Sequence, residues 1–241
     1  MATRSDHRDS LRALDPSDVP AFLTAHSGLP GPRGNLELLA AFGDVAPESL
    51  VLSLVGSADE YHASCAAAAL GLLVAEHGDD GGLLALLHTQ AADPRWRVRE
   101  GVAMALQRLG DTEPARLRGV VARWALDPDP LVQRAAIAGI CEPRLLRDPA
   151  TAAAALDACR VTTDLLGARP TGERRGLETR TLRQALGYCW SVAVAGSPAA
   201  GLQAFATLTP SWAVGPFRLG LPLTWRYPGG LSAALLWGAV L

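Results

Sequence analysis

Apolar residues recur at spacings of three and four along most of the chain, the pattern of helices that bury one face. Runs of β-branched residues are few, so strand signals are weak. Several helix starts are marked by Pro after an acidic or hydroxyl residue, because Pro suits the first helical position and the preceding side chain caps the helix. These starts are Asp93-Pro94, Asp129-Pro130, Asp148-Pro149 and Ser197-Pro198. The pattern predicts helices over residues 36–43, 47–56, 60–76, 81–90, 94–109, 114–126, 130–145, 149–166, 175–194 and 198–207.

A repeat emerges when DPRWRVREGVAMAL (93–106) is laid on DPDPLVQRAAIAGI (127–140), an ungapped offset of 34 residues. A looser third copy is TLRQALGYCW (181–190). The coinciding positions are apolar in every copy: Val98, Val102 and Leu106; Val132, Ala136 and Ile140; Leu182, Leu186 and Trp190. Positions four residues apart form one helical stripe, so each copy predicts a helix buried against its neighbours.

The length of this helix-pair unit and its D-P…V-R…A-L pattern resemble HEAT repeats. We therefore expect an all-α, HEAT-like helical-repeat solenoid (an armadillo-like superhelix) of about five helix pairs, with turns such as Gly110-Asp111 between partners. Residues 27–208 are predicted to form the repeat domain. Residues 1–26 form an N-terminal segment, and residues 209–241 an irregular C-terminal cap or tail.

The charge of the chain is unevenly distributed, although the formal net charge is only −2. Residues 1–89 carry 4 Arg and 12 acidic residues, residues 90–185 carry 16 Arg and 12 acidic residues, and the remainder carries 2 Arg and no acid. All 22 basic residues are Arg. A net sum of −2 excludes a uniformly basic nucleic-acid binder, but it leaves a basic strip in the middle of the chain open.

The spacing of the cysteines and histidines matches none of the common metal-binding motifs. Cys65, Cys141, Cys159 and Cys189 form no CxxC pair, and the five His residues form no HxxxH or HExxH pair, so we expect no metal and no cofactor. Without an apolar leader at its start, the chain is expected to be cytoplasmic with reduced thiols. The uncharged stretch 184–217 is interrupted too early for a membrane-spanning helix, so we expect no membrane partner.

The overlay stacks Glu100, Arg134 and Gln184 at equivalent positions of successive repeats. Trp96, Glu100, Ala103 and Gln107 share one predicted helix face, flanked by Arg99. This polar column has two interpretations. In the first, the column lines an exposed groove in which an aromatic ring, a carboxylate and guanidinium groups converge. In the second, Glu100 and Arg134 form an ion-pair ladder between repeats, and such a ladder contributes little stability when it is exposed.

Four segments resemble the HEAT-like-repeat DNA glycosylases of the AlkD type, which excise alkylated purines. The segments are GLPGPRGNLELL (28–39), PRWRVREGV (94–102), LVQRAAIAG (131–139) and RQALGYCWSVAVAGSPAAGLQAF (183–205). The resemblance implies a catalytic site formed by the carboxylate of Glu100 and the aromatic ring of Trp96, and DNA contacts by Arg134 and Tyr188. The implied set of nucleic-acid-binding residues is Arg97, Arg99, Arg134, Arg183, Gln184 and Tyr188.

In that family the carboxylate stabilises positive charge on the sugar as the base departs. The chain departs from the family in having Glu100 where the family typically has Asp, and Tyr188 where it typically has Trp. The sequence thus predicts a HEAT-repeat protein that engages duplex DNA through an Arg-lined concave face. The resemblance to the AlkD type would make it an alkylpurine N-glycosylase, and whether the chain is an enzyme stays open. The alternative is a non-catalytic HEAT-repeat adaptor that binds a protein partner. A lyase unit acting on chromophore-bearing proteins is a third alternative with no specific residue pattern behind it, and the oligomeric state stays open.

Overall fold

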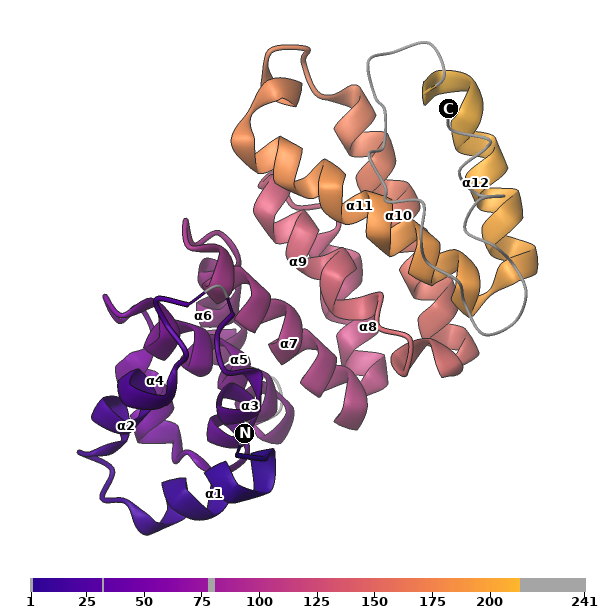
Figure 1. Ribbon diagram of the computed structural model, residues 1–241. Helices are drawn as coiled ribbons and strands as arrows, with labels where there is room; N and C mark the ends of the chain where they lie inside the picture. The colour runs from indigo at the N-terminus through magenta and orange to yellow at the C-terminus, as the bar shows by residue number, and fades with distance from the viewer. Residues whose placement is uncertain (1, 32, 78–80, 213–241) are drawn as a thin grey trace. The chain divides into compact units, whose positions relative to one another are not determined.

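The computed structural model describes residues 2–31, 33–77 and 81–212, and these fold as helices without a strand (Figure 1). No helix among them is long and apolar enough to cross a membrane. The α-helices are α1 (Arg4–Ala13), α2 (Val19–His26), α3 (Leu36–Val45), α4 (Glu48–Leu54), α5 (Glu60–Glu76), α6 (Gly81–Ala91), α7 (Trp96–Thr112), α8 (Pro114–Trp124), α9 (Pro130–Ile140), α10 (Pro149–Ala168), α11 (Leu177–Gly196) and α12 (Pro198–Trp212). Short 3-10 turns at Leu145–Arg147 and Glu173–Arg175 precede α10 and α11.

The chain divides into two compact units, Met1–Glu113 and Pro114–Leu241, and the boundary between them falls inside the predicted repeat domain. In the first unit, α4 packs beside α5 and α6 beside α7, so these helices form pairs. Helices α3, α5 and α7 form a continuous layer, with α1 packed on α3 and α2 on α5. Residues 1–26, predicted only as an N-terminal segment, therefore contribute two helices to this unit.

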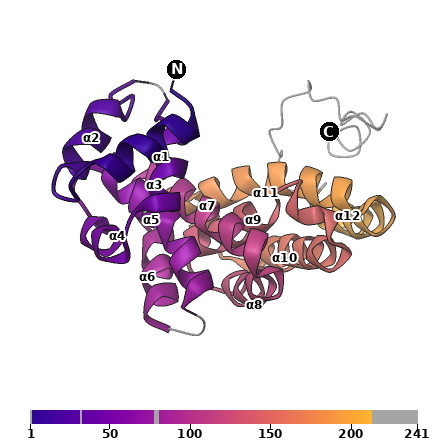
Figure 2. The same ribbon diagram turned by 90° about the horizontal axis from the view of Figure 1, so that it is seen from below.

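The second unit repeats the two-layer arrangement (Figure 2). Helix α8 pairs with α9 and α10 pairs with α11, while α8 lies against α10 and α9 against α11. Helix α12 packs on α11. Of the predicted C-terminal cap or tail, residues 209–212 continue α12 and residues 213–241 lie outside the described residues.

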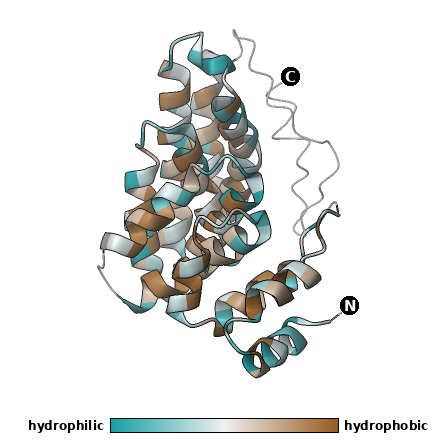
Figure 3. Ribbon diagram, turned by 90° about the vertical axis from the view of Figure 1, so that its left-hand side faces the viewer, coloured by the Kyte–Doolittle hydropathy of each residue, from teal (hydrophilic) through white to brown (hydrophobic). Residues whose placement is uncertain are grey.

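The buried stripe predicted from the overlay is confirmed in all three copies. The side chains at 98, 102, 106, 132, 136, 140, 182, 186 and 190 are each no more than 3% exposed. Apolar residues accordingly gather on the inward faces of the helices (Figure 3). The all-α, HEAT-like helical-repeat fold predicted from the sequence is therefore confirmed.

Helices α5 and α7 approach closely because small residues occupy their contact. An added Cβ at Gly71 would lie 2.1 Å from the backbone oxygen of Ala105, and one at Gly101 would lie 2.6 Å from the backbone oxygen of Ser64. Only glycine leaves room for two backbones at these distances. This contact aligns the first turn of α5 with the first turn of α7.

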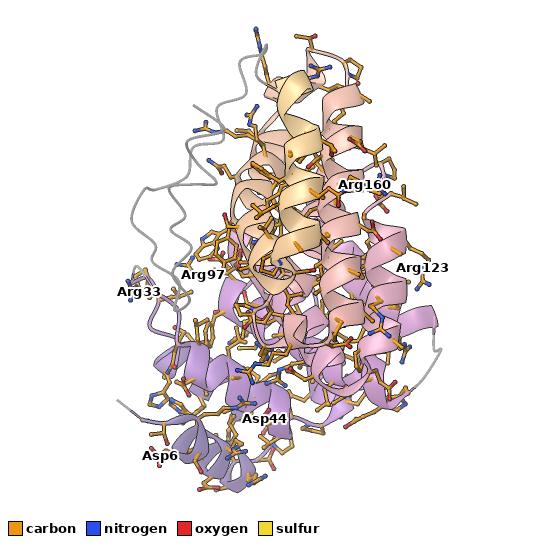
Figure 4. The ribbon with its side chains drawn as sticks, turned by 90° about the vertical axis from the view of Figure 1, so that its right-hand side faces the viewer. Asp6, Arg33, Asp44, Arg97, Arg123 and Arg160 are labelled. Atoms are coloured by element: carbon orange, nitrogen blue, oxygen red, sulfur yellow. The ribbon has the colours of Figure 1, made fainter. Side chains whose placement is uncertain are left out.

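Asp44 joins three helices of the first unit (Figure 4). Its carboxylate on α3 accepts hydrogen bonds from Arg4 of α1 at 2.6 and 2.7 Å, and from Arg108 of α7 at 3.1 Å. Burial by itself would raise the pKa of Asp44, but the hydrogen bond from Arg4 and the charge of Arg108 outweigh it and lower that pKa. The ionised carboxylate is thus the form that the folded unit favours.

Three details of the sequence prediction are wrong. Gly110 and Asp111 do not form a turn, because α7 continues through them to Thr112. The helix predicted over 130–145 ends at Ile140, since Pro143 disfavours helical backbone in the residue before it. Asp93 does not cap α7, whose N-cap is Arg95.

The structure brings together three cysteines that are far apart in the sequence. Cys141 ends α9, and its sulfur lies 3.8 Å from that of Cys159 on α10. Cys189 of α11 adjoins the same pair and is also buried. Hydrogen bonding with Cys159 and burial raise the pKa of Cys141 well above its ordinary value, and burial also raises the pKa of Cys159, so this pair favours the protonated thiol form.

Candidate functional site

The residues predicted on α7 begin at its first turn, where an aromatic side chain is exposed. Trp96 is 53% exposed, and Glu100, one turn later, is half-buried. Ala103 was predicted to share this face but is 3% exposed, and Gln107 is half-buried. Among these four residues, Trp96 at the N-terminal end of α7 is therefore the exposed one.

The guanidinium groups around this end already bind acceptors of the same chain. Arg95 donates to the carboxylate of Asp93 at 2.7 and 2.9 Å, which lowers the pKa of Asp93. Arg97 donates from Nη1 to Glu60 Oε2 at 3.0 Å. Arg99 donates to the backbone oxygens of residues 93 and 94 at 2.6 and 2.7 Å. These arginines hold the start of α7 in place.

A pocket of about 420 Å³ lies beside this end of α7 in the first unit. Its walls come from the end of α2, the loop that follows it, and the first turns of α5 and α7. The lining residues are Thr24, Ser27, Leu29, Pro30, Asp59, Glu60, Tyr61 and Arg97. Arg97 also stacks on Trp96, with its central guanidinium carbon 4.9 Å from the ring centroid. The exposed tryptophan and the pocket are thus joined by one side chain.

The polar groups of the pocket are organised by the first turn of α5. Asp59 caps this helix, because its Oδ1 accepts from the backbone N–H groups of Tyr61 at 2.8 Å and His62 at 3.1 Å. The hydroxyl of Tyr61 donates to the backbone oxygen of Asn35 at 2.6 Å, which fixes the ring. The Nε2 of His62 lies 2.9 Å from the oxygen of Thr24. Two carboxylates and one paired guanidinium therefore define the charge of the pocket.

The remaining predicted residues lie on the second unit. Arg134 is on α9, while Arg183, Gln184 and Tyr188 are on α11, which packs against α9. Gln184 is exposed, Tyr188 is 48% exposed, and the two arginines are half-buried. Arg134 and Gln184 occupy equivalent positions of the repeat overlay, and Tyr188 lies one turn after Gln184 on α11. The structure thus distributes the predicted site over two units, with Trp96, Arg97, Arg99 and Glu100 on the first.

Within the described ranges, no group of three or more His, Cys, Asp and Glu side chains is arranged to hold a metal ion. The sequence reading missed the pocket residues Thr24, Asp59 and Tyr61. One signal was available, since Asp59 directly precedes an apolar helical run and is a typical N-cap. The convergence of three separate segments, residues 24–30, residues 59–61 and Arg97, has no local sequence signal.

Comparisons with known proteins support the repeat fold. A family model of HEAT repeats matches residues 47–141, which span α4 through α9. A solved structure titled "Crystal Structure of Engineered Protein" is similar to the chain at 16% identity, covering 88% of this chain and 94% of that one with a TM-score of 0.35. At that TM-score the likeness adds nothing to the fold assignment. No curated protein matches the chain.

Proposed function

We propose that this chain is a non-catalytic HEAT-repeat adaptor that binds a protein partner at the N-terminal end of α7. The observation that carries the proposal is Trp96, which is 53% exposed and adjoins, through Arg97, a pocket of about 420 Å³. Tryptophan is one of the residue types enriched in the binding hot spots of protein interfaces. HEAT repeats are a scaffold that offers such surfaces.

Charge favours the adaptor over a glycosylase at this end of the chain. The first unit carries 8 Arg and 16 acidic residues, a net charge of −8. Arg95, Arg97 and Arg99 are bound by groups of their own unit. Phosphate binding needs cations that are available to the backbone of the nucleic acid. We therefore assign Glu100 a structural role on α7 and expect Glu100→Gln to leave the binding of the protein partner intact.

The proposal is tested by replacing Trp96 with the photocrosslinking residue p-benzoylphenylalanine in native cells. Leu126 of the second unit, 63% exposed, is the matched control site. We expect a partner that crosslinks at position 96 and not at position 126. The identified partner is then purified and must bind the purified chain about tenfold more weakly after Trp96→Ala, as for a hot-spot residue. Equal binding by Trp96→Ala, or no partner at position 96, would overturn the proposal.

A second candidate function is duplex DNA binding by the α9–α11 surface, because the second unit is basic. It carries 14 Arg and 8 acidic residues, a net charge of +6. Arg134 lies on α9, and Arg183, Gln184 and Tyr188 lie on α11. Guanidinium groups suit phosphates, and an aromatic ring suits a sugar or base. This candidate keeps the predicted DNA partner and needs no catalysis by Glu100.

The DNA candidate is tested by fluorescence anisotropy of a labelled duplex over a series of salt concentrations. Binding that weakens steeply with salt and is reduced in Arg134→Gln/Arg183→Gln would support it. A parallel assay measures release of alkylated purine from duplex DNA by the wild type and Glu100→Gln. Release by the wild type that is lost in Glu100→Gln would replace the adaptor by a glycosylase of the AlkD type.

A further inference from the structure

We infer that the pocket of the first unit receives a basic side chain, Arg or Lys, from an extended segment of the partner protein. The inference rests on the proposed adaptor function and gives the chemistry of its partner. It follows from the charge, the remaining hydrogen-bonding capacity and the shape of the pocket.

The charge of the pocket is negative. Asp59 and Glu60 supply two carboxylates against the single guanidinium of Arg97. That guanidinium donates to Glu60 at 3.0 Å, so its charge is already compensated within the pocket. The first unit as a whole has a net charge of −8, which attracts cations over a longer range. A cationic group is therefore the complementary ligand.

The carboxylates keep accepting capacity toward the pocket. An ionised carboxylate has about four lone-pair sites. Asp59 uses Oδ1 to cap α5, while its Oδ2 is 3.5 Å from the hydroxyl of Thr24 and 3.9 Å from Nε2 of His62. Glu60 binds Arg97 through Oε2, and its side chain is 27% exposed. A guanidinium or ammonium group that enters here donates charge-assisted hydrogen bonds to the carboxylates of Asp59 and Glu60.

The shape of the pocket fits a long side chain with a charged tip. Its volume of about 420 Å³ is at the lower end for small-molecule sites. Leu29, Pro30 and the ring of Tyr61 form an apolar wall suited to the methylene stem of Arg or Lys. Trp96 lies beyond Arg97 and offers its ring to the next residue of the partner segment. One basic side chain flanked by an apolar residue is the motif this arrangement selects.

The inference is tested on the full chain with acetylated and amidated pentapeptides of the form Gly-Ser-Xaa-Leu-Gly, where Xaa is Arg, Lys, norleucine or Glu and Leu is the constant apolar neighbour. Amide NMR signals of Thr24, Leu29 and Tyr61 report binding. We expect shifts with the Arg and Lys peptides that weaken as salt is added, and none with norleucine or Glu. Equal shifts with norleucine, stronger shifts with Glu, or no shift with any peptide would overturn the inference.

Two variants separate the pocket from general charge. Glu60→Gln is expected to weaken the Arg peptide about tenfold, as for loss of a charge-assisted hydrogen bond. Glu37→Gln makes the same charge change at an exposed position of α3, outside the pocket lining, and should leave the affinity unchanged. Glu60→Gln also leaves Arg97 without its carboxylate, so a second variant is needed. Leu29→Ala keeps the ion pair between Glu60 and Arg97 and shortens the apolar wall. It should also weaken the binding of the Arg peptide. Equal weakening by Glu37→Gln, or none by Glu60→Gln and Leu29→Ala, would contradict the inference.

Failure here is distinguishable from failure of the adaptor proposal. Suppose that no peptide binds, while position 96 still crosslinks a partner and Trp96→Ala weakens the binding of that partner. The inference of a basic ligand is then wrong, and the adaptor proposal stands. If the partner is lost as well, both are wrong.

Discussion

The close contact between α5 and α7 makes Gly71→Ala a sharp test of the first unit. The new Cβ would lie 2.1 Å from the backbone oxygen of Ala105 and 2.5 Å from its Cα. Ordinary contact begins near 3.4 Å, so the two helices would have to separate by about 1.3 Å. Backbone atoms cannot rotate away as a side chain can, and the strain must be spread over both helices.

The expected net cost is about 1–3 kcal/mol, the usual range for an overpacked core. Ala is a better helix former than Gly by about 1 kcal/mol, so the steric cost must exceed this gain. For a chain of this size, each kcal/mol lowers the melting temperature by about 2–4 °C. Separation of α5 from α7 would also lengthen the 3.0 Å contact between Glu60 and Arg97 and disturb the pocket.

The assay is thermal and urea unfolding followed by circular dichroism, with Gly119→Ala as the control. Gly119 lies within α8, and an added Cβ there meets only the end of Arg123 at 3.9 Å. This variant should stabilise the protein by about 0.5–1 kcal/mol. Opposite signs for the two variants are the expected result. Gly71→Ala as stable as the wild type would show that α5 and α7 are not in backbone contact and would refute the reasoning.

Three further predictions concern stability. Asp44→Asn removes the carboxylate that joins α1, α3 and α7 and should destabilise the first unit at neutral pH. Because the folded state lowers the pKa of Asp44, this contribution is present above the ordinary pKa near 3.9 and is lost as the pH falls through the lower folded value; the wild type and variant should therefore converge in acid unfolding curves. Asp129→Ala removes the cap on Leu131 N–H and should cost about 1 kcal/mol in urea unfolding, with Asp129→Asn largely retaining the cap. Thr163→Val leaves the buried indole N–H of Trp190 without its acceptor at 3.0 Å and should cost about 1–3 kcal/mol, whereas Thr163→Ser should cost less.

The buried stripes could be predicted from the sequence because they repeat every four residues within each copy, and nothing but helix periodicity is needed to read them. The first helix could not be read this way. Only His7 and Leu11 are buried on α1, too few for a periodic signal. Its capping box between Thr3 and Asp6 was the signal that remained.

The predicted start of α7 lies two residues too early for a specific reason. Asp93 has the sequence of a cap, but its carboxylate accepts from the backbone and guanidinium of Arg95 instead. The carboxylate of an Asp at such a position either caps the N–H groups of the first helical turn or binds a neighbouring side chain, and a sequence pattern does not decide between the two. The candidate site could likewise be predicted only in part, because tertiary packing brings most of its residues together. Trp96 was identified from its position on a helix face, whereas Thr24 and Asp59 join it through tertiary packing alone.

Because every cysteine is buried, the reactivity of each thiol reports how often its surroundings unfold. Cys65 lies in the first unit, and the cluster of Cys141, Cys159 and Cys189 lies in the second. A thiol that is buried in the native state reacts with an alkylating reagent only when its surroundings unfold. Mass spectrometry of the alkylated peptides would therefore report the opening free energy of each unit separately, in one sample and without any engineered label.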